Sequence, residues 1–175
     1  MNTNLCICCG EIVPEGRQVC YKCEHNTIKK ENKVMTIALA NKDLFTVPQG
    51  YYLAHCISAD FALGAGIAKT FDEVYNMRFK LFREYDNYTY EGGDALLIDN
   101  VFNLVTKPKC YHKPRYEAVR EALETMRDIM EMNATTKVAM PKIGCGLDRL
   151  DWDEVYDIIC EVFEDTDVDI LICEL

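Results

Sequence analysis

Short apolar runs alternate with longer amphipathic stretches from Val34 to the end of the chain. Apolar runs with the length and content of buried strands lie at 34–40, 52–57, 95–99, 101–106, 137–140 and 168–173. Between them, apolar positions recur at spacings of three and four, as in amphipathic helices, over 66–82, from Pro114 onward, and over 152–164. Such alternation predicts a three-layer α/β/α domain with a mostly parallel or mixed sheet over residues 34–175.

The first 33 residues follow a different pattern, with paired cysteines in "CICCGEIVPEGRQVCYKC" (6–23). Two CxxC pairs separated by ten residues suit a tetrahedral zinc ion, which would supply the folding energy that so short a segment lacks. We therefore predict a zinc-ribbon-like module at 1–25 and a polar linker at 26–33, with structural zinc and no catalytic metal. The predicted ligands are Cys6, Cys9, Cys20 and Cys23.

Two alternatives to that zinc site stay open. The cysteines could instead be redox-active or simply buried, although the paired spacing favours metal. Cys8 could replace Cys9 as a ligand, although the knuckle spacing favours Cys9.

Composition limits where the chain acts. Hydrophobic residues make up 49% of it, but no stretch approaches the roughly 20 apolar residues that span a membrane. The N-terminus lacks the basic start and apolar run of a secretory signal. We expect an intracellular protein, cytoplasmic or, in a eukaryote, nuclear, without membrane partners, whose ten cysteines are thiols or metal ligands.

The net charge of −10 lies almost entirely in residues 34–175, since residues 1–33 are nearly neutral. This distribution argues against strong non-specific binding to duplex DNA, which needs a basic surface. A small anionic ligand is still compatible with the charge, because backbone amides can hold it locally. The N-terminal module is as suited to a protein partner as to nucleic acid.

Two glycine-rich segments follow predicted strands, and we call them the first glycine loop, "LGAGIA" (63–68), and the second glycine loop, "IGCGLD" (143–148). In this fold class, ligands bind where strands end and helices begin. Amides near a helix N-terminus favour an anion, so two facing loops would suit a diphosphate. Cys145 could be a nucleophile, but we interpret it as small filler whose backbone amide matters more than its thiol.

Several segments together resemble the macrodomain family, and within it the terminal ADP-ribose protein glycohydrolase subgroup, which includes antitoxins that reverse DNA ADP-ribosylation. They are "DLF" (43–45), "LAHCIS" (53–58), "GAGIA" (64–68), "LVTK" (104–107), "HKPRYE" (112–117) and "MPKIGCGLDRL" (140–150). The resemblance runs from about Val34 to Leu175 and implies a mixed central sheet. Two departures are Lys42, where the family usually has glycine, and the absence of its "FGG" helix ending.

The resemblance implies a site for ADP-ribose, with Asp43 accepting hydrogen bonds from the adenine amino group. Ser58 and the first glycine loop would line the distal ribose and phosphates, and the second glycine loop would hold phosphate. The other ligand-binding residues implied are Leu44, Gly64, Ala65, Gly66, Ile67, Ala68, Ile143, Gly144, Cys145, Gly146 and Leu147.

The same resemblance implies catalysis by Lys107, which would attack C1″ of the distal ribose, and by Asp148, which would assist release. A lysine nucleophile must be neutral, and a nearby carboxylate can shuttle its protons but also holds it charged when the two pair tightly. The ligand must therefore separate them. We expect a hydrolase that removes ADP-ribose from protein carboxylates or nucleobases. The alternatives are an ADP-ribose-ester deacylase and a reader without turnover, either delivered by the zinc module.

Overall fold

The computed structural model describes residues 4–5, 12–13, 18 and 34–174, and the chain divides into two compact units, Met1–Lys33 and Val34–Leu175. In the first unit, β1 (Asn4–Leu5) and β2 (Ile12–Val13) form an antiparallel pair. The predicted linker and the four predicted zinc ligands, Cys6, Cys9, Cys20 and Cys23, lie outside the described residues. The zinc module is therefore still a prediction.

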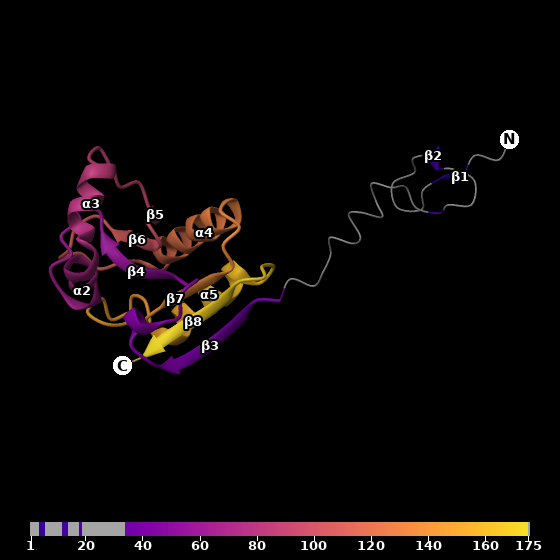
Figure 1. Ribbon diagram of the computed structural model, residues 1–175. Helices are drawn as coiled ribbons and strands as arrows, with labels where there is room; N and C mark the ends of the chain where they lie inside the picture. The colour runs from indigo at the N-terminus through magenta and orange to yellow at the C-terminus, as the bar shows by residue number, and fades with distance from the viewer. Residues whose placement is uncertain (1–3, 6–11, 14–17, 19–33, 175) are drawn as a thin grey trace. The chain divides into compact units, whose positions relative to one another are not determined.

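A single six-stranded sheet forms the centre of the second unit (Figure 1). Its strands are β3 (Thr36–Asn41), β4 (Tyr52–Ser58), β5 (Asp94–Ile98), β6 (Val101–Lys107), β7 (Lys137–Met140) and β8 (Asp169–Glu174). The spatial order is β3-β8-β7-β4-β6-β5. β5 pairs antiparallel with β6, and the other neighbours pair in parallel, so the predicted mixed sheet is confirmed.

Four α-helices cover the two faces of this sheet and complete the three predicted layers (Figure 1). α2 (Gly66–Tyr75) and α3 (Met77–Glu84) pack on one face, and α4 (Tyr116–Met132) and α5 (Trp152–Phe163) pack on the other. Alternate residues of each strand enter opposite cores, as the pleat of a strand requires. Along β6, for example, Leu104 packs with α4 and Val105 packs with α2 and α3. No helix within 34–174 is long and apolar enough to cross a membrane.

The single helix that the periodicity predicts over 66–82 is two helices in the structure. Asn76 adopts a left-handed conformation with φ of 54°, which ends α2 and starts α3. The carboxylate of Asp72 accepts a hydrogen bond from the Arg78 amide at 2.9 Å, which satisfies a leading donor of α3. Asparagine tolerates this conformation better than most residues, so the break costs little. The apolar stripe continues across it, and periodicity alone does not reveal it.

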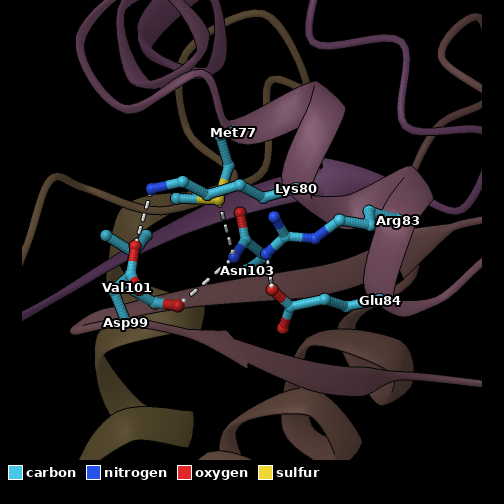
Figure 2. Close-up of polar contacts among 7 residues, drawn as sticks. All are labelled: Met77, Lys80, Arg83, Glu84, Asp99, Val101 and Asn103. Carbon is cyan, nitrogen blue, oxygen red and sulfur yellow. Dashed lines mark hydrogen bonds and ion pairs between the residues drawn. The ribbon is translucent and has the colours of Figure 1, made fainter.

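α3 is tied to the hairpin of β5 and β6 by polar contacts (Figure 2). Lys80 donates to the carboxylate of Asp99 at 2.7 Å, in the turn of that hairpin. The buried side-chain amide of Asn103 donates through Nδ2 to the Met77 sulfur at 3.5 Å and to the Val101 carbonyl at 3.2 Å. These bonds satisfy a polar side chain inside the core, as burial requires. The bonds of Lys80 with Asp99 and of Asn103 with Met77 hold α3 against the hairpin.

Candidate active site

A cavity of about 650 Å³ opens where β6, β4 and β7, which are neighbours in the sheet, reach their carboxyl ends. Both glycine loops contribute to its walls, as predicted from their place after strands. Of the residues implied by the family resemblance, its lining contains Ser58, Gly64, Ala65, Gly66, Ile67, Ala68, Lys107, Ile143, Gly144, Gly146, Leu147 and Asp148. The fold therefore brings most of the predicted site together in one place.

Lys107 and Asp148 form an ion pair on the wall of this cavity. The Lys107 Nζ atom donates to Asp148 Oδ1 at 2.5 Å, and the two side chains are only 13% and 14% exposed. Lys107 is the last residue of β6 and lies opposite Ser58 of β4, after an irregularity in the pairing. Asp148 comes from the second glycine loop. The amine is therefore supported by a paired strand and the carboxylate by a loop.

The first glycine loop presents backbone donors to the cavity. Gly66 has φ of 57°, which glycine adopts without cost, and it starts α2. Ala65 is the N-cap and supplies no side-chain acceptor, so the leading amides of α2 are open to a ligand. Leu147 of the second glycine loop reaches across to this point, because a Cβ atom added at Gly66 would lie 3.3 Å from its Cδ1 atom.

The second glycine loop needs its glycines for different reasons. Gly144 has φ of 71°, a conformation that strains other residues, and an added Cβ atom 2.8 Å from Leu150 Cδ1 would also force that side chain to shift. An added Cβ at Gly146 would meet no atom within 4 Å. Cys145 is not in the cavity lining; its thiol donates to the Ile143 carbonyl and packs against the core. Burial raises the pKa of that thiol, so the structure does not favour Cys145 as a nucleophile.

Asp43 and Leu44 lie outside the lining of this cavity. Asp43 is the N-cap of the short 3₁₀ helix η1 (Leu44–Thr46), and its carboxylate accepts a hydrogen bond from the Phe45 amide at 2.9 Å. Leu44 is buried. Lys42, at the unusual position, continues the β3–β8 pairing by donating its amide to the Glu174 carbonyl. A role for Asp43 in binding adenine therefore stays a proposal.

One wall of the cavity is formed by residues 107–113, the segment that we call the strap, and of its residues the sequence predicted only Lys107 as part of the site. Cys110, Tyr111, His112 and Lys113 line the cavity from this wall, and Tyr111 is 76% exposed. A signal was present in the sequence, since three lysines and no acid occur in residues 107–113, which begin at the last residue of β6. The cavity lining also contains Cys56, Ile57, Leu63, Pro141 and Lys142, which lie in the quoted segments but were not among the predicted site residues.

His55 and Cys56 point to opposite faces of the sheet, so they do not form a catalytic pair, as expected for neighbours on a strand. His55 is fully buried and stacks on Phe71 of α2 with ring centroids 3.9 Å apart. Cys56 lines the cavity and packs with the opposite core. Burial, with the charge of Asp148 added, raises the pKa of the Cys56 thiol to about 12, which keeps it neutral.

The cavity is locally positive although the chain is acidic. Its lining includes Lys107, Lys113 and Lys142 but only one carboxylate, that of Asp148. Lys142 also pairs with Glu174 at 2.5 Å, so its charge is partly compensated. Combined with the open amides of α2, this charge suits an anionic ligand with more than one phosphate.

Solved structures of known macrodomains have the same fold. The macrodomain of Thermus aquaticus DarG superposes with a TM-score of 0.68 at 21% identity, covering 81% of this chain and 99% of that one. Thermosipho africanus DarTG, solved in complex with ADP-ribose, superposes with a TM-score of 0.61 at 16% identity, covering 78% of this chain and 41% of that one. No protein-family model matches the chain.

Sequence comparison decides the family. The ADP-ribose glycohydrolase OARD1 of Bos taurus is 41% identical over 143 residues, which are 79% of this chain and 91% of the relative. The OARD1 protein of Homo sapiens is 36% identical over 154 residues, covering 86% of this chain and 99% of the relative. The chain belongs to the OARD1 macrodomain family. The family resemblance seen in the motifs is thereby confirmed.

Proposed function

We propose that this protein hydrolyses the bond between C1″ of an ADP-ribosyl group and a macromolecular carrier, which is a protein carboxylate or a nucleobase. The relatives named ADP-ribose glycohydrolase support hydrolysis of an ADP-ribosyl bond. The observation that carries the assignment of residues is the ion pair of Lys107 and Asp148, which lies in the same cavity as both glycine loops.

The diphosphate of the ligand would lie between the two glycine loops. Gly66, Ile67 and Ala68 line the cavity at the uncapped N-terminus of α2, where amides and the helix dipole favour an anion. The distal ribose would then extend towards Ser58 and Lys107, which face each other at the ends of β4 and β6. This orientation places the anomeric carbon next to the amine.

The proposed reaction proceeds in two steps through Lys107. Nζ of the neutral amine forms a bond to C1″ while the bond from C1″ to the carrier breaks and the carrier leaves with the electron pair. The proton lost from nitrogen passes through Asp148. Water then adds at C1″ of the lysyl intermediate, and Asp148 takes a proton from that water and passes it to nitrogen. The C1″–N bond breaks with its electron pair on this protonated nitrogen, which releases ADP-ribose and restores the Lys107 amine.

The tight pair in the structure describes the resting enzyme. The Lys107 Nζ atom is held by the Asp148 carboxylate at 2.5 Å, and a nitrogen engaged in this contact is not free to attack. Hydroxyl groups of the distal ribose can compete for Asp148 when substrate enters, which would release the amine. The ion pair would therefore keep the Lys107 amine unreactive until the correct ligand is bound.

A panel of ADP-ribosylated proteins and oligonucleotides would test the proposal, with wild type and Lys107→Ala assayed in parallel for release of free ADP-ribose. We expect wild type to release ADP-ribose from at least one carrier class, and Lys107→Ala to bind ADP-ribose without releasing it. Binding by wild type without release from any carrier would make the protein a reader. Full turnover by Lys107→Ala would exclude the lysine as nucleophile.

A further inference from the structure

The strap is anchored to the sheet at the end from which it starts. The Ala59 amide donates to the Lys107 carbonyl at 2.9 Å, next to the nucleophile. Asp60 accepts hydrogen bonds from the Ser58 hydroxyl at 2.5 Å and from the Cys110 amide at 3.2 Å. Partial burial alone would raise the pKa of Asp60, but these hydrogen bonds and the Lys109 charge outweigh burial and lower it. Asp60 therefore stays charged and holds the strap in place.

The other end of the strap reaches across the cavity to the second glycine loop. The Lys113 Nζ atom donates to the Leu147 carbonyl oxygen at 2.8 Å. Lys113 is exposed, but Pro114 is buried directly after it and α4 begins at Tyr116. The strap thus carries two lysines that contact consecutive residues of the opposite loop: Lys107 contacts Asp148, and Lys113 contacts Leu147.

The second glycine loop closes mainly on itself. The Arg149 amide donates to the Gly146 carbonyl at 3.2 Å, and the Leu150 amide donates to the Gly144 carbonyl at 3.0 Å. Around Gly146 there is open space, and the Leu147 side chain is 67% exposed. The start of the loop is held by the buried Ile143 and by Cys145, which packs against the core, whereas the segment around Gly146 and Leu147 depends more on contacts from outside the loop.

We infer that Lys113 is a positioning residue that holds Asp148 in place during turnover. The Leu147 carbonyl belongs to the peptide unit that ends at the Asp148 nitrogen, and that unit is planar. Fixing the carbonyl therefore fixes the plane from which the Asp148 side chain departs. This inference rests on the proposed chemistry of Lys107 and Asp148.

Lys107 itself cannot hold Asp148 in place throughout the reaction. Its contact with Asp148 must break before attack, and its nitrogen is bonded to C1″ afterwards. During the second step, Lys113 still holds the loop through the backbone, because its bond does not involve the Asp148 carboxylate. Lys113 should therefore matter most when the lysyl intermediate is resolved.

A direct contact between the Lys113 ammonium and the ligand diphosphate is the competing role, since Lys113 also lines the cavity. The two roles affect different kinetic quantities. Loss of a phosphate contact weakens binding of free ADP-ribose, whereas loss of positioning lowers kcat and leaves that binding in place.

Lys113→Met, Lys113→Arg and a matched control, Lys109→Met, would separate the two roles. Lys109→Met removes the same charge from an exposed position of the same strap. For Lys113→Met we expect ADP-ribose affinity within about twofold of wild type by calorimetry, because the ligand contacts remain. We expect kcat to fall by about 10- to 10²-fold, as for small misplacement of a catalytic group. Covalent ADP-ribosyl enzyme should accumulate during turnover, and Lys113→Arg should restore part of kcat.

A weaker affinity with unchanged kcat in Lys113→Met would overturn the inference in favour of phosphate binding, as would an equal loss of kcat in Lys109→Met. Hydrogen exchange provides a readout independent of activity. Amides of residues 144–150 should exchange faster in Lys113→Met than in wild type and Lys109→Met, and unchanged exchange would also overturn the inference. If wild type releases no ADP-ribose from any carrier, the proposed function fails while the exchange result still decides whether Lys113 holds the loop.

Discussion

Lys107 and Asp148 are 41 residues apart in the sequence, yet their side chains form an ion pair with a separation of 2.5 Å. Their meeting follows from topology, since β4 lies between β6, which ends at Lys107, and β7, which leads into the loop of Asp148. β6 positions the Lys107 amine, and the second glycine loop positions the Asp148 carboxylate. Neither residue alone points to the proposed site, whereas their contact inside this cavity supports it.

Replacing Lys107 and replacing Asp148 should impair different steps of the reaction. Lys107→Ala should lower turnover by at least about 10³-fold, as for loss of a nucleophile, while it still binds ADP-ribose. Asp148→Ala should allow attack and stall resolution, because water addition and release need a proton shuttle. Intact-protein mass spectrometry of Asp148→Ala incubated with substrate should show the added mass of one ADP-ribosyl group.

The double variant Lys107→Ala, Asp148→Ala is the control for that adduct. The added mass should be absent from it, because the attacking nitrogen is gone. An adduct that persists in the double variant would place the covalent bond on another side chain. Peptide mapping of the single variant then shows whether Lys107 carries the group.

Gly146 offers a test of where the phosphates lie. A side chain at Gly146 meets open space at the edge of the cavity, so a substitution should not disturb folding. Gly146→Glu places a carboxylate near the proposed diphosphate, and repulsion of about 1–4 kcal/mol should weaken ADP-ribose binding by about 10- to 10³-fold. Calorimetry measures this affinity, and thermal unfolding checks the fold.

Gly146→Gln is the matched variant, because it has the same shape without the charge. It should bind much more tightly than Gly146→Glu. Equal losses in both variants would mean that bulk rather than charge causes the effect. Undiminished binding by Gly146→Glu would refute the placement of phosphate beside the second glycine loop.

The sequence predicted the elements that carry the site better than the contacts inside it. Each predicted apolar run is a strand in the structure, because buried strands need apolar residues. Both glycine loops line the cavity, because loops that need backbone freedom are rich in glycine. Little in the sequence indicated that the strap would line the cavity. Its exposed residues have no period, and the bond from Lys113 to Leu147 joins segments that only the folded sheet brings together.

Two other differences have local causes. The break at Asn76 was missed because the apolar stripe of α2 continues into α3, and a single left-handed residue does not interrupt periodicity. The environment of Asp43 was missed because its carboxylate caps η1, a helix of one turn. Short helices and single-residue conformations are set by tertiary contacts, which a pattern of hydrophobicity does not contain.

The cysteine pairs in the N-terminal unit predict one zinc ion per chain. The four proposed ligands are Cys6, Cys9, Cys20 and Cys23. Metal analysis of full-length protein purified without chelator should give about one equivalent of zinc, as for a closed Cys₄ site. Cys20→Ser should lose most of that zinc, while ADP-ribose binding by the macrodomain continues.

Cys110→Ser serves as the control for metal content, because Cys110 is exposed and belongs to the other unit. Its zinc content should equal that of wild type. Purified wild-type protein that contains no zinc, or a disulfide between Cys6 and Cys23 in freshly lysed cells, would exclude the zinc module.

His55 should make the macrodomain less stable in mild acid. Its Nε2 atom lies 2.9 Å from Asn103 Oδ1, and Asn103 donates through its amide nitrogen, so Nε2 is the donor of this pair. Within the described residues, Nδ1 is buried without a partner. Burial lowers the pKa of His55 to about 3, and the hydrogen bond to Asn103 offsets only part of that shift.

The direction of the pH effect follows from these values. An unfolded chain binds a proton at His55 below the ordinary pKa of 6.5, whereas the folded protein does not bind it until about 3. The contribution of neutral His55 to stability is therefore complete above 6.5 and is lost as pH falls from 6.5 towards 3. The loss is about 1.4 kcal/mol per pH unit, or roughly 2 kcal/mol between about pH 7.5 and about pH 5.

Urea unfolding followed by fluorescence of Trp152, the single tryptophan of the chain, measures this difference in wild type and His55→Gln. Glutamine can still donate to Asn103 but does not titrate. His55→Gln should be less stable at neutral pH, because it loses the stacking on Phe71, yet its stability should fall less than that of wild type on acidification. His112→Gln, in which an exposed histidine is replaced, should follow wild type. If His55→Gln and wild type lose equal stability between the two pH values, other groups cause the acid sensitivity and His55 contributes nothing to it.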